Sequence, residues 1–260
     1  MAAEFDLDLL RAAGQIDHVE YHPTLTSTND YARDASARYG RHESLLVIAA
    51  EQTAGRGRGS NRWWTGSGSL AFSLLFDPAA LGIARQHCAM VSLAAALAIV
   101  EAVNPRIAPY SAGIHWPNDV YVGRRKLAGI LVEVLPDGRH ILGIGINVNN
   151  SVDDAPQELA ELVATMLDLS RRPFDRGELL TDLLSHLRPR LAQLARMPEL
   201  IGREANGICL QHGRPLCVQS GSREFRGRCF GIGDDGALVL DTAEGRRNIY
   251  AGFLKPVDNV

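Results

Sequence analysis

The segment EQTAGRGRGSNRWW, residues 51–64, gathers residue types that suit the binding of an anion next to a flat ring. Its alternating glycines let the backbone approach a ligand closely, and exposed N–H groups in such a loop can form a concave anion site. Arg56 and Arg58 add guanidinium groups that pair with phosphate or carboxylate oxygens. Trp63 and Trp64 offer faces on which a base can stack. We interpret the segment as a ligand-binding loop that is mobile when empty, with a plain solvent-exposed loop as the alternative.

A second cluster, HWPNDVYVGRRKLAGILVE at 115–133, has the pattern of a β-hairpin. Lys126 opens its almost wholly apolar return strand, which makes the side chain a cation on a rigid support. Gly129 leaves a gap in the side-chain wall through which a ligand chain could pass. Further on, GIGINVN at 143–149 interrupts an apolar strand with Asn147, an amide that needs a specific partner. Lys126, Gly129 and Asn147 are therefore candidate site residues.

The composition narrows the classes of function. A net charge of −3 and a pI of about 6.2 argue against a bulk electrostatic attraction to nucleic acid. The apolar run at 88–103 is shorter than the roughly 18 residues of a membrane span and predicts a buried helix. The acidic N-terminus lacks the pattern of a signal peptide, so we expect a cytoplasmic protein with free thiols at its four cysteines. GIGDDG at 231–236 has dinucleotide-loop spacing, but it falls in a predicted hairpin rather than before a helix.

Apolar periodicity predicts the elements that hold these clusters. A helix should begin at an N-cap provided by Ser27 or Thr28 and continue over 29–39. From residue 206 on, short alternating segments with frequent turns predict a small β-barrel. The sequence therefore predicts an α+β fold with two domains, 1–204 and 205–260. Strands are predicted at 18–25, 45–50, 70–76, 114–116, 119–123, 126–135 and 140–149, and further helices at 83–103, 156–167 and 175–195.

Five motifs occur together and in order. They are STN (27–29), GRGR (55–58) with a following Arg62 and tryptophan, WPND (116–119), KLAGILVE (126–133) and GIGIN (143–147). In this combination the sequence resembles the biotin protein ligases, also called biotin–[acetyl-CoA carboxylase] ligases. The resemblance is strong over 20–150 and weak over 205–258. It implies a mixed β-sheet flanked by helices, of the class II synthetase-like biotin/lipoate ligase type, followed by a small SH3-like barrel.

The resemblance also implies a reaction. Biotin and ATP, with Mg²⁺, would form biotinyl-5′-AMP, and a lysine of a biotin carboxyl carrier domain would then take the biotin. Lys126 and Arg58 would be catalytic, and Asp119 is the candidate metal ligand. The implied biotin-binding residues are Ser27, Thr28, Asn29, Gln52, Gly55, Arg56, Lys126 and Gly129. The implied ATP- and adenylate-binding residues are Arg56, Arg58, Arg62, Trp63, Trp64, Asn118, Lys126 and Asn147.

Three departures from the family pattern matter. Three residues, GSN, separate GRGR from Arg62 where the family usually has two, so either Trp63 or Trp64 could stack on adenine. His115 stands where lysine is usual. Only 26 residues precede STN, where many relatives carry a DNA-binding domain, so we expect no operator binding. The alternatives are a lipoate–protein ligase or related acyltransferase, and a non-catalytic module that recognises carrier domains. The sequence leaves the oligomeric state open, a homodimer included.

Overall fold

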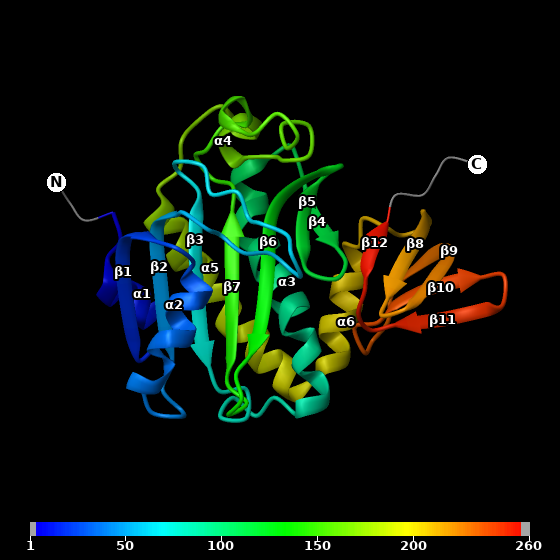
Figure 1. Cartoon of the computed structure of the whole chain (residues 1–260), viewed down its shortest axis with the longest axis horizontal. Helices are drawn as coiled ribbons and strands as arrows, with labels where there is room; N and C mark the ends of the chain where they lie inside the picture. Colours follow the sequence, from blue (N-terminus) through cyan, green and yellow to red (C-terminus); the bar gives the residue numbers. More distant parts are fainter. Residues whose placement is uncertain (1–3, 256–260) are drawn as a thin grey trace.

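The computed structural model describes residues 4–255, which form a large mixed sheet with helices and a smaller C-terminal sheet (Figure 1). The large sheet has the order β1-β2-β3-β7-β6-β5-β4, in which β1 and β2 are parallel and all other neighbours antiparallel. The predicted mixed sheet is thereby confirmed. Its strands are β1 (His18–Leu25), β2 (Leu45–Gln52), β3 (Leu70–Phe76), β4 (Ala112–His115), β5 (Asp119–Val122), β6 (Arg125–Val134) and β7 (His140–Ile146).

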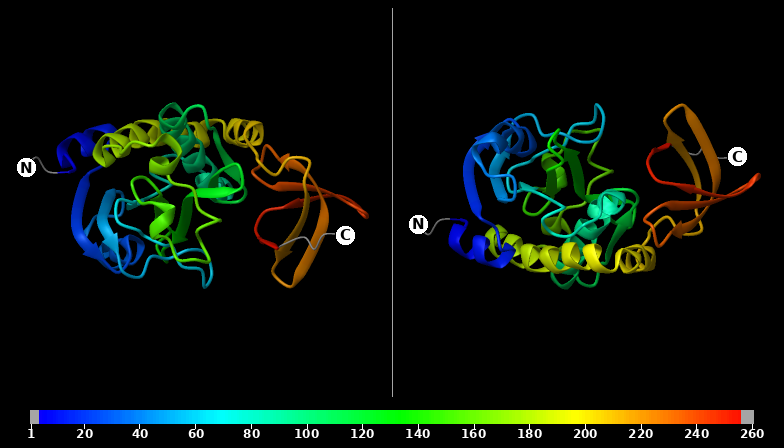
Figure 2. Two further views of the ribbon diagram at one scale, coloured as in Figure 1. Left: turned by 90° about the horizontal axis from the view of Figure 1, so that it is seen from above. Right: turned by 90° about the horizontal axis from the view of Figure 1, so that it is seen from below.

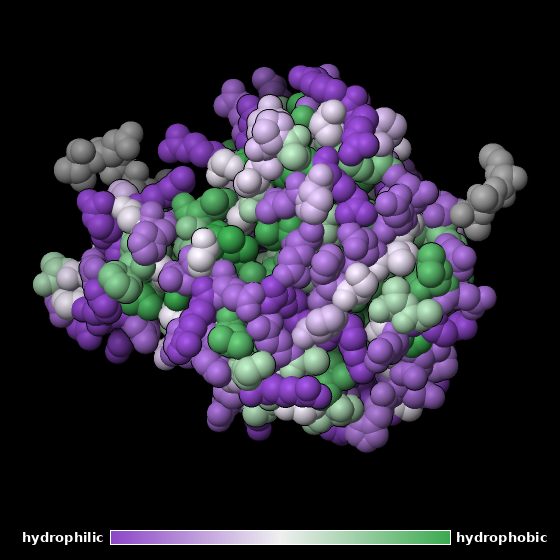
Figure 3. All heavy atoms as spheres, turned by 180° about the vertical axis from the view of Figure 1, so that it is seen from behind, coloured by the Kyte–Doolittle hydropathy of each residue, from purple (hydrophilic) through white to green (hydrophobic). Residues whose placement is uncertain are grey.

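Helices cover both faces of this sheet (Figure 2). On one face lie α1 (Leu7–Gly14), α3 (Val91–Ile107) and α5 (Arg176–Arg196), and α6 (Pro198–Gly207) continues α5 toward the C-terminal sheet. The outer surface of this helical layer is mostly hydrophilic, because its apolar side chains face inward (Figure 3). On the other face lies α2 (Thr28–Ala35), extended by a 3₁₀ turn at Ser36–Arg38.

The apolar run that the sequence predicts as a buried helix forms a 3₁₀ turn (Arg85–Met90) and α3. By length and composition alone, Arg85–Ile107 could cross a membrane. Most of this helix is buried within the protein, since it packs against α5 and the sheet. It is therefore the central helix of the hydrophobic core.

Successive side chains of β7 point to opposite faces of the sheet, so every second one faces α2. Leu142, Ile144 and Ile146 of β7 point into the main core beneath α3 and α5. Ile141 packs on the opposite side with residues of α2. The intervening glycines of β7 therefore face the α2 side, where their missing side chains leave a hollow.

The C-terminal unit is a five-stranded antiparallel sheet of the order β11-β10-β9-β8-β12, in line with the expected small barrel. Helix α6 continues through the predicted boundary after residue 204, and the first strand begins at Pro215. The domain limits remain a prediction. The strands are β8 (Pro215–Ser220), β9 (Arg223–Ile232), β10 (Leu238–Thr242), β11 (Gly245–Ile249) and β12 (Phe253–Lys255).

The helix predicted at 156–167 is wrong. This region contains a 3₁₀ turn (Val152–Asp154), irregular turns and the short α4 (Met166–Ser170). Its backbone pairs instead with the start of β6, because Lys126 N–H donates to the Leu162 carbonyl and Ala164 N–H to the Lys126 carbonyl. Local bonds within the segment form turns only, and these two long-range bonds tie its end to the strand that carries Lys126.

Candidate active site

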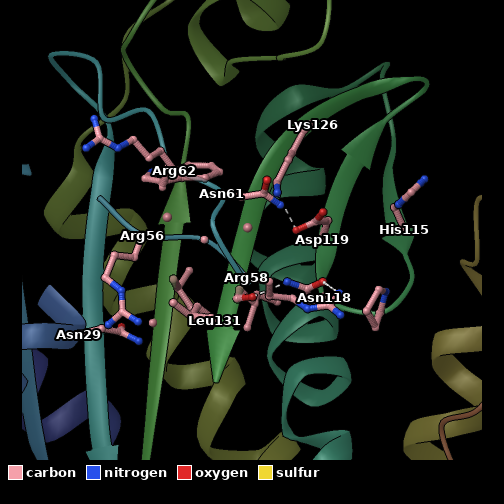
Figure 4. A pocket seen from close by; sticks show the side chains of 18 of the residues that line it. Asn29, Arg56, Arg58, Asn61, Arg62, His115, Asn118, Asp119, Lys126 and Leu131 are labelled. Atoms are coloured by element: carbon pink, nitrogen blue, oxygen red, sulfur yellow. Dashed lines mark hydrogen bonds and ion pairs between the residues drawn. The ribbon is translucent and has the colours of Figure 1, made fainter. Parts of the chain in front are cut away.

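A cavity of about 240 Å³ lies between the loop of residues 55–66 and the α2 side of the central strands (Figure 4). Small-molecule sites usually measure about 300–1,000 Å³. The cavity is slightly below that range, and loop residues form part of its wall. The sequence-predicted residues that line it are Ser27, Thr28, Asn29, Gln52, Arg56, Arg58, Arg62, Trp63, Asn118, Asp119, Lys126 and Gly129.

One end of the cavity is built on the N-terminus of α2. Ser27 is the N-cap, so Thr28 and Asn29 enter the first turn with their side chains buried. The side-chain oxygen of Gln52, Oε1, accepts a hydrogen bond from Thr28 N–H at 2.8 Å. The Ser73 hydroxyl lies 2.6 Å from Asn29 Oδ1. These groups form a fixed set of donors and acceptors, as a small polar ring such as a urea requires.

Glu133, which the sequence did not single out, organises the same end. Its carboxylate accepts from Asn29 Nδ2 at 2.8 Å, from Arg33 at 2.7 Å and from Arg56 at 3.0 Å. Arg56 also donates to Asp30. Burial alone would lower the pKa of Arg56, but these bonds and charges raise it. Arg56, predicted to meet both substrates, therefore lies with Asn29 (Figure 4) and not beside Lys126.

The other end carries Lys126. A β-bulge between β5 and β6 shifts the register there, and bulges commonly re-aim a side chain. Lys126 Nζ thereby lies 2.8 Å from Asp119 Oδ1 (Figure 4). Buried Asn147 donates from Nδ2 to the Lys126 carbonyl at 3.3 Å and does not line the cavity. Asn147 therefore supports the strand that holds Lys126, and its contact with the nucleotide stays a prediction.

Arg58 lies on the other side of the WPND turn. It donates to Asn118 Oδ1 at 3.0 Å and to the Gly252 carbonyl of the C-terminal sheet at 2.7 Å. Burial lowers the pKa of Arg58, and the charge of Asp119 opposes that shift. The two predicted catalytic cations are thus held by adjacent residues of one turn, Asn118 and Asp119.

Two paired glycines, Gly129 and Gly145, lie beneath the loop, and we call them the glycine floor. Gly129 of β6 pairs with Gly145 of β7, and a Cβ at Gly145 would lie 2.4 Å from the Trp63 indole. A Cβ at Gly129 would lie 3.0 Å from the same indole and 3.2 Å from Lys126 Nζ. The gap that the sequence assigned to a ligand chain is therefore filled by Trp63 and Lys126. Gly129 still lines the cavity because the indole and the amine leave room beside it.

The structure separates the two tryptophans. Trp63 lines the cavity, whereas Trp64 packs beside Gly66 and Asn150 outside it. Gly55 also lies outside the lining, since it forms the base of the loop, where a Cβ would lie 2.7 Å from the Trp63 carbonyl. Arg62 lines the cavity but is exposed, and its guanidinium points away from Lys126 (Figure 4).

His115 and several other residues also line the cavity. The His115 ring stacks on the Tyr121 ring, with their centroids 4.4 Å apart. Burial lowers the pKa of His115, and the charge of Asp119 has a smaller opposing effect. Gly143 and Gly145 were visible in the GIGIN motif. Phe253 gave no signal, because it comes from a strand far along the chain. The lining residues outside the predictions are Gly57, Asn61, His115, Trp116, Pro117, Tyr121, Ile130, Leu131, Gly143, Ile144, Gly145, Phe253 and Leu254.

Asp119 is the one carboxylate among the described residues that line the cavity. Its buried Oδ1 is ion-paired with Lys126 but accepts no well-aligned hydrogen bond. Within residues 4–255 no group of three metal-ligating side chains is present. Mg²⁺ is typically held by one or two carboxylates together with substrate phosphates, and the donor set here fits that arrangement.

Known proteins share this fold and these motifs. Residues 21–150 match the Biotin/lipoate A/B protein ligase family, and residues 212–252 match the Biotin protein ligase C terminal domain. The bifunctional ligase/repressor BirA of Bacillus subtilis is 31% identical over 246 residues, 92% of this chain and 74% of the relative. A biotin–[acetyl-CoA-carboxylase] ligase of Mycobacterium tuberculosis is 33% identical over 202 residues, 76% of this chain and 74% of the relative. The Aquifex aeolicus biotin protein ligase in complex with biotin and ATP superposes with a TM-score of 0.81 and 25% identity, over 92% of this chain and 98% of that chain.

Fold and motifs together place the chain among protein ligases. The chain belongs to the biotin/lipoate A/B protein ligase family. Within that family its activity is of the biotin protein ligase class, because the relatives and the solved neighbour above are biotin ligases.

Proposed function

We propose that this chain activates biotin with ATP, giving biotinyl-5′-AMP and pyrophosphate, and then transfers biotin to a lysine of a carboxyl carrier domain. In the first step an oxygen of the biotin carboxylate attacks the α-phosphorus, and the bond to pyrophosphate breaks. In the second step the lysine amine attacks the acyl carbon, AMP leaves, and one proton is released from the amine.

The observation that carries the proposal is that two cations from different elements are held by two adjacent residues, Asn118 and Asp119. Lys126 is held by Asp119, and Arg58 is held by Asn118. Negative charge grows on the oxygens of the α-phosphorus during attack, and cations fixed in advance stabilise it without reorganising. The polar groups of Thr28 and Gln52 at the opposite end suit the ureido ring of biotin.

Trp63 contributes a flat wall between these two ends. Its indole lies against Gly129 and Gly145, with Lys126 Nζ 5.6 Å from the ring centroid, and an indole face would stack on adenine. The loop that carries it would exclude water from the acyl-adenylate, which hydrolyses readily. Mg²⁺, when bound with ATP, would neutralise phosphate charge, and Asp119 is the residue that would hold it.

Pyrophosphate release tests the proposal. Purified protein should release pyrophosphate with biotin and ATP, and a biotin carrier domain should then become labelled on lysine. Turnover with lipoate and not with biotin would support the lipoate ligase instead. Carrier binding without pyrophosphate release would support a non-catalytic module. Cytoplasmic location, the absence of DNA and membrane binding, and a homodimer remain predictions.

A further inference from the structure

The tip of the loop of residues 55–66 contacts Phe253 of β12, the last strand of the described residues. The guanidinium carbon of Arg58 lies 4.5 Å from the centroid of the Phe253 ring, and Arg58 donates to the Gly252 carbonyl at 2.7 Å. A Cβ at the neighbouring Gly59 would lie 3.6 Å from Cζ of the same ring. The ring face of Phe253 in β12 and the carbonyl of Gly252 just before that strand thus both contact Arg58, which lies 194 positions earlier in the chain than Gly252.

Burial of apolar surface does not account for the position of Phe253. Its side chain is 46% exposed, so the ring is not part of the packed interior of the C-terminal sheet. A guanidinium prefers the face of an aromatic ring, and a planar group held by a ring, a carbonyl and Asn118 has a defined orientation. The contacts come from the C-terminal sheet and the WPND turn, so they join both parts of the protein.

We propose that Phe253 is a positioning residue, whose ring holds Arg58 at the edge of the cavity so that the C-terminal sheet sets the closed position of the loop. Phe253 acts through Arg58 and does not touch the reacting atoms. The effect of Phe253 on retention of biotinyl-AMP rests on the proposed function. The claim that Phe253 holds Arg58 and so positions the loop rests only on the contacts above.

Loss of the ring should free the loop tip. The carbonyl and Asn118 contacts of Arg58 would remain, so the loop should open more often without losing its fold. A cation–π contact at a partly exposed site corresponds to a change of about two- to fivefold. We therefore expect biotinyl-AMP to escape about two- to fivefold faster from Phe253→Leu than from the wild type.

Phe230→Leu is the matched control. Phe230 lies in β9, is 49% exposed and has the guanidinium carbon of Arg246 at 3.7 Å from its ring centroid, but it does not line the cavity. Escape of biotinyl-AMP and trypsin cleavage after the loop arginines, followed by mass spectrometry, should both increase in Phe253→Leu and stay at wild-type rates in Phe230→Leu. Phe253→Trp keeps a ring face and should restore both rates. Phe253→Met serves in place of the leucine variant if that variant does not fold.

A double-mutant cycle separates positioning from a general structural role. In an Arg58→Gly background, Phe253→Leu should add no further leakage, because the ring has lost its partner. Additive leakage, wild-type behaviour of Phe253→Leu, or an equal effect of Phe230→Leu would overturn the inference. If the wild type forms no biotinyl-AMP, the proposed function fails, and the trypsin comparison still decides whether Phe253 seats the loop.

Discussion

Lys126 Nζ lies 2.8 Å from Asp119 Oδ1, and this ion pair fixes the amine above the glycine floor of the cavity. The preceding residue, Asn118, holds Arg58 through a hydrogen bond at 3.0 Å. Asn118 is itself held by β6, because its Nδ2 donates to the Ile130 carbonyl at 2.6 Å. A single turn therefore orients both cations before any substrate binds.

Lys126→Ala should abolish adenylation and leave the fold intact. The variant removes a cation that the α-phosphate needs in the transition state, and loss of one such group costs roughly 10²–10³-fold in rate. Pyrophosphate release measures the loss, and circular dichroism checks the fold. Lys255→Ala removes the other lysine of the chain, which pairs with Glu224 on the C-terminal sheet, and should keep normal turnover. Near-wild-type release by Lys126→Ala would contradict the assignment.

Arg58→Gly should give an enzyme that still forms biotinyl-AMP but releases it to solvent. The substitution removes the contacts of Arg58 with Asn118 and Gly252, so the loop loses its anchor on both sides. Arg58→Lys keeps the charge without the planar fork, and we expect intermediate leakage. Chromatographic detection of free biotinyl-AMP decides the matter, and unchanged retention would refute a closing role for the loop.

Glu133→Gln should raise the KM for biotin about tenfold and change kcat little, since hydrogen bonds to charged groups contribute roughly 1.5–3 kcal/mol. Glutamine can still accept from Asn29, but it loses the charge that holds Arg33 and Arg56. Steady-state kinetics with varied biotin measures the effect. An equal fall of kcat with unchanged KM would place Glu133 in the chemical step instead.

The matched control for Glu133→Gln is Asp137→Asn. Asp137 pairs with Arg139 at 2.8 Å, and neither residue lines the cavity. This variant removes one carboxylate charge from the turn between β6 and β7, so it reports the general effect of losing an ion pair. Its KM for biotin should equal that of the wild type.

Gly145→Ala should weaken ATP binding while the protein stays folded. The added methyl would lie 2.4 Å from the Trp63 indole, and the indole, carried by a loop, is the group that can move. Gly207→Ala is the control, because a Cβ there meets nothing within 4 Å. Calorimetric titration with ATP measures both variants. Wild-type ATP affinity in Gly145→Ala would show that the indole position does not matter for the nucleotide.

Much of the fold follows from local sequence patterns. The strands at 18–25 and 70–76 have the predicted limits, because short apolar runs bounded by turn residues specify strands through interactions within the segment. The N-cap at Ser27 follows from the same local chemistry. The segment at 156–167 defeats this reasoning, since its local backbone bonds form only turns and its end pairs with Lys126 of a distant strand.

The sequence by itself determined the candidate catalytic groups, because the motifs contain Lys126, Arg58 and Asp119 at fixed spacings. Tertiary structure alone decided their neighbours: Trp63 over the glycine floor, Glu133 on Arg56 and Phe253 beneath Arg58. Strand order, the bulge directly after Lys126 and the docking of β12 bring together residues that lie far apart along the chain. Local periodicity carries no record of such pairings, since they depend on how whole elements pack.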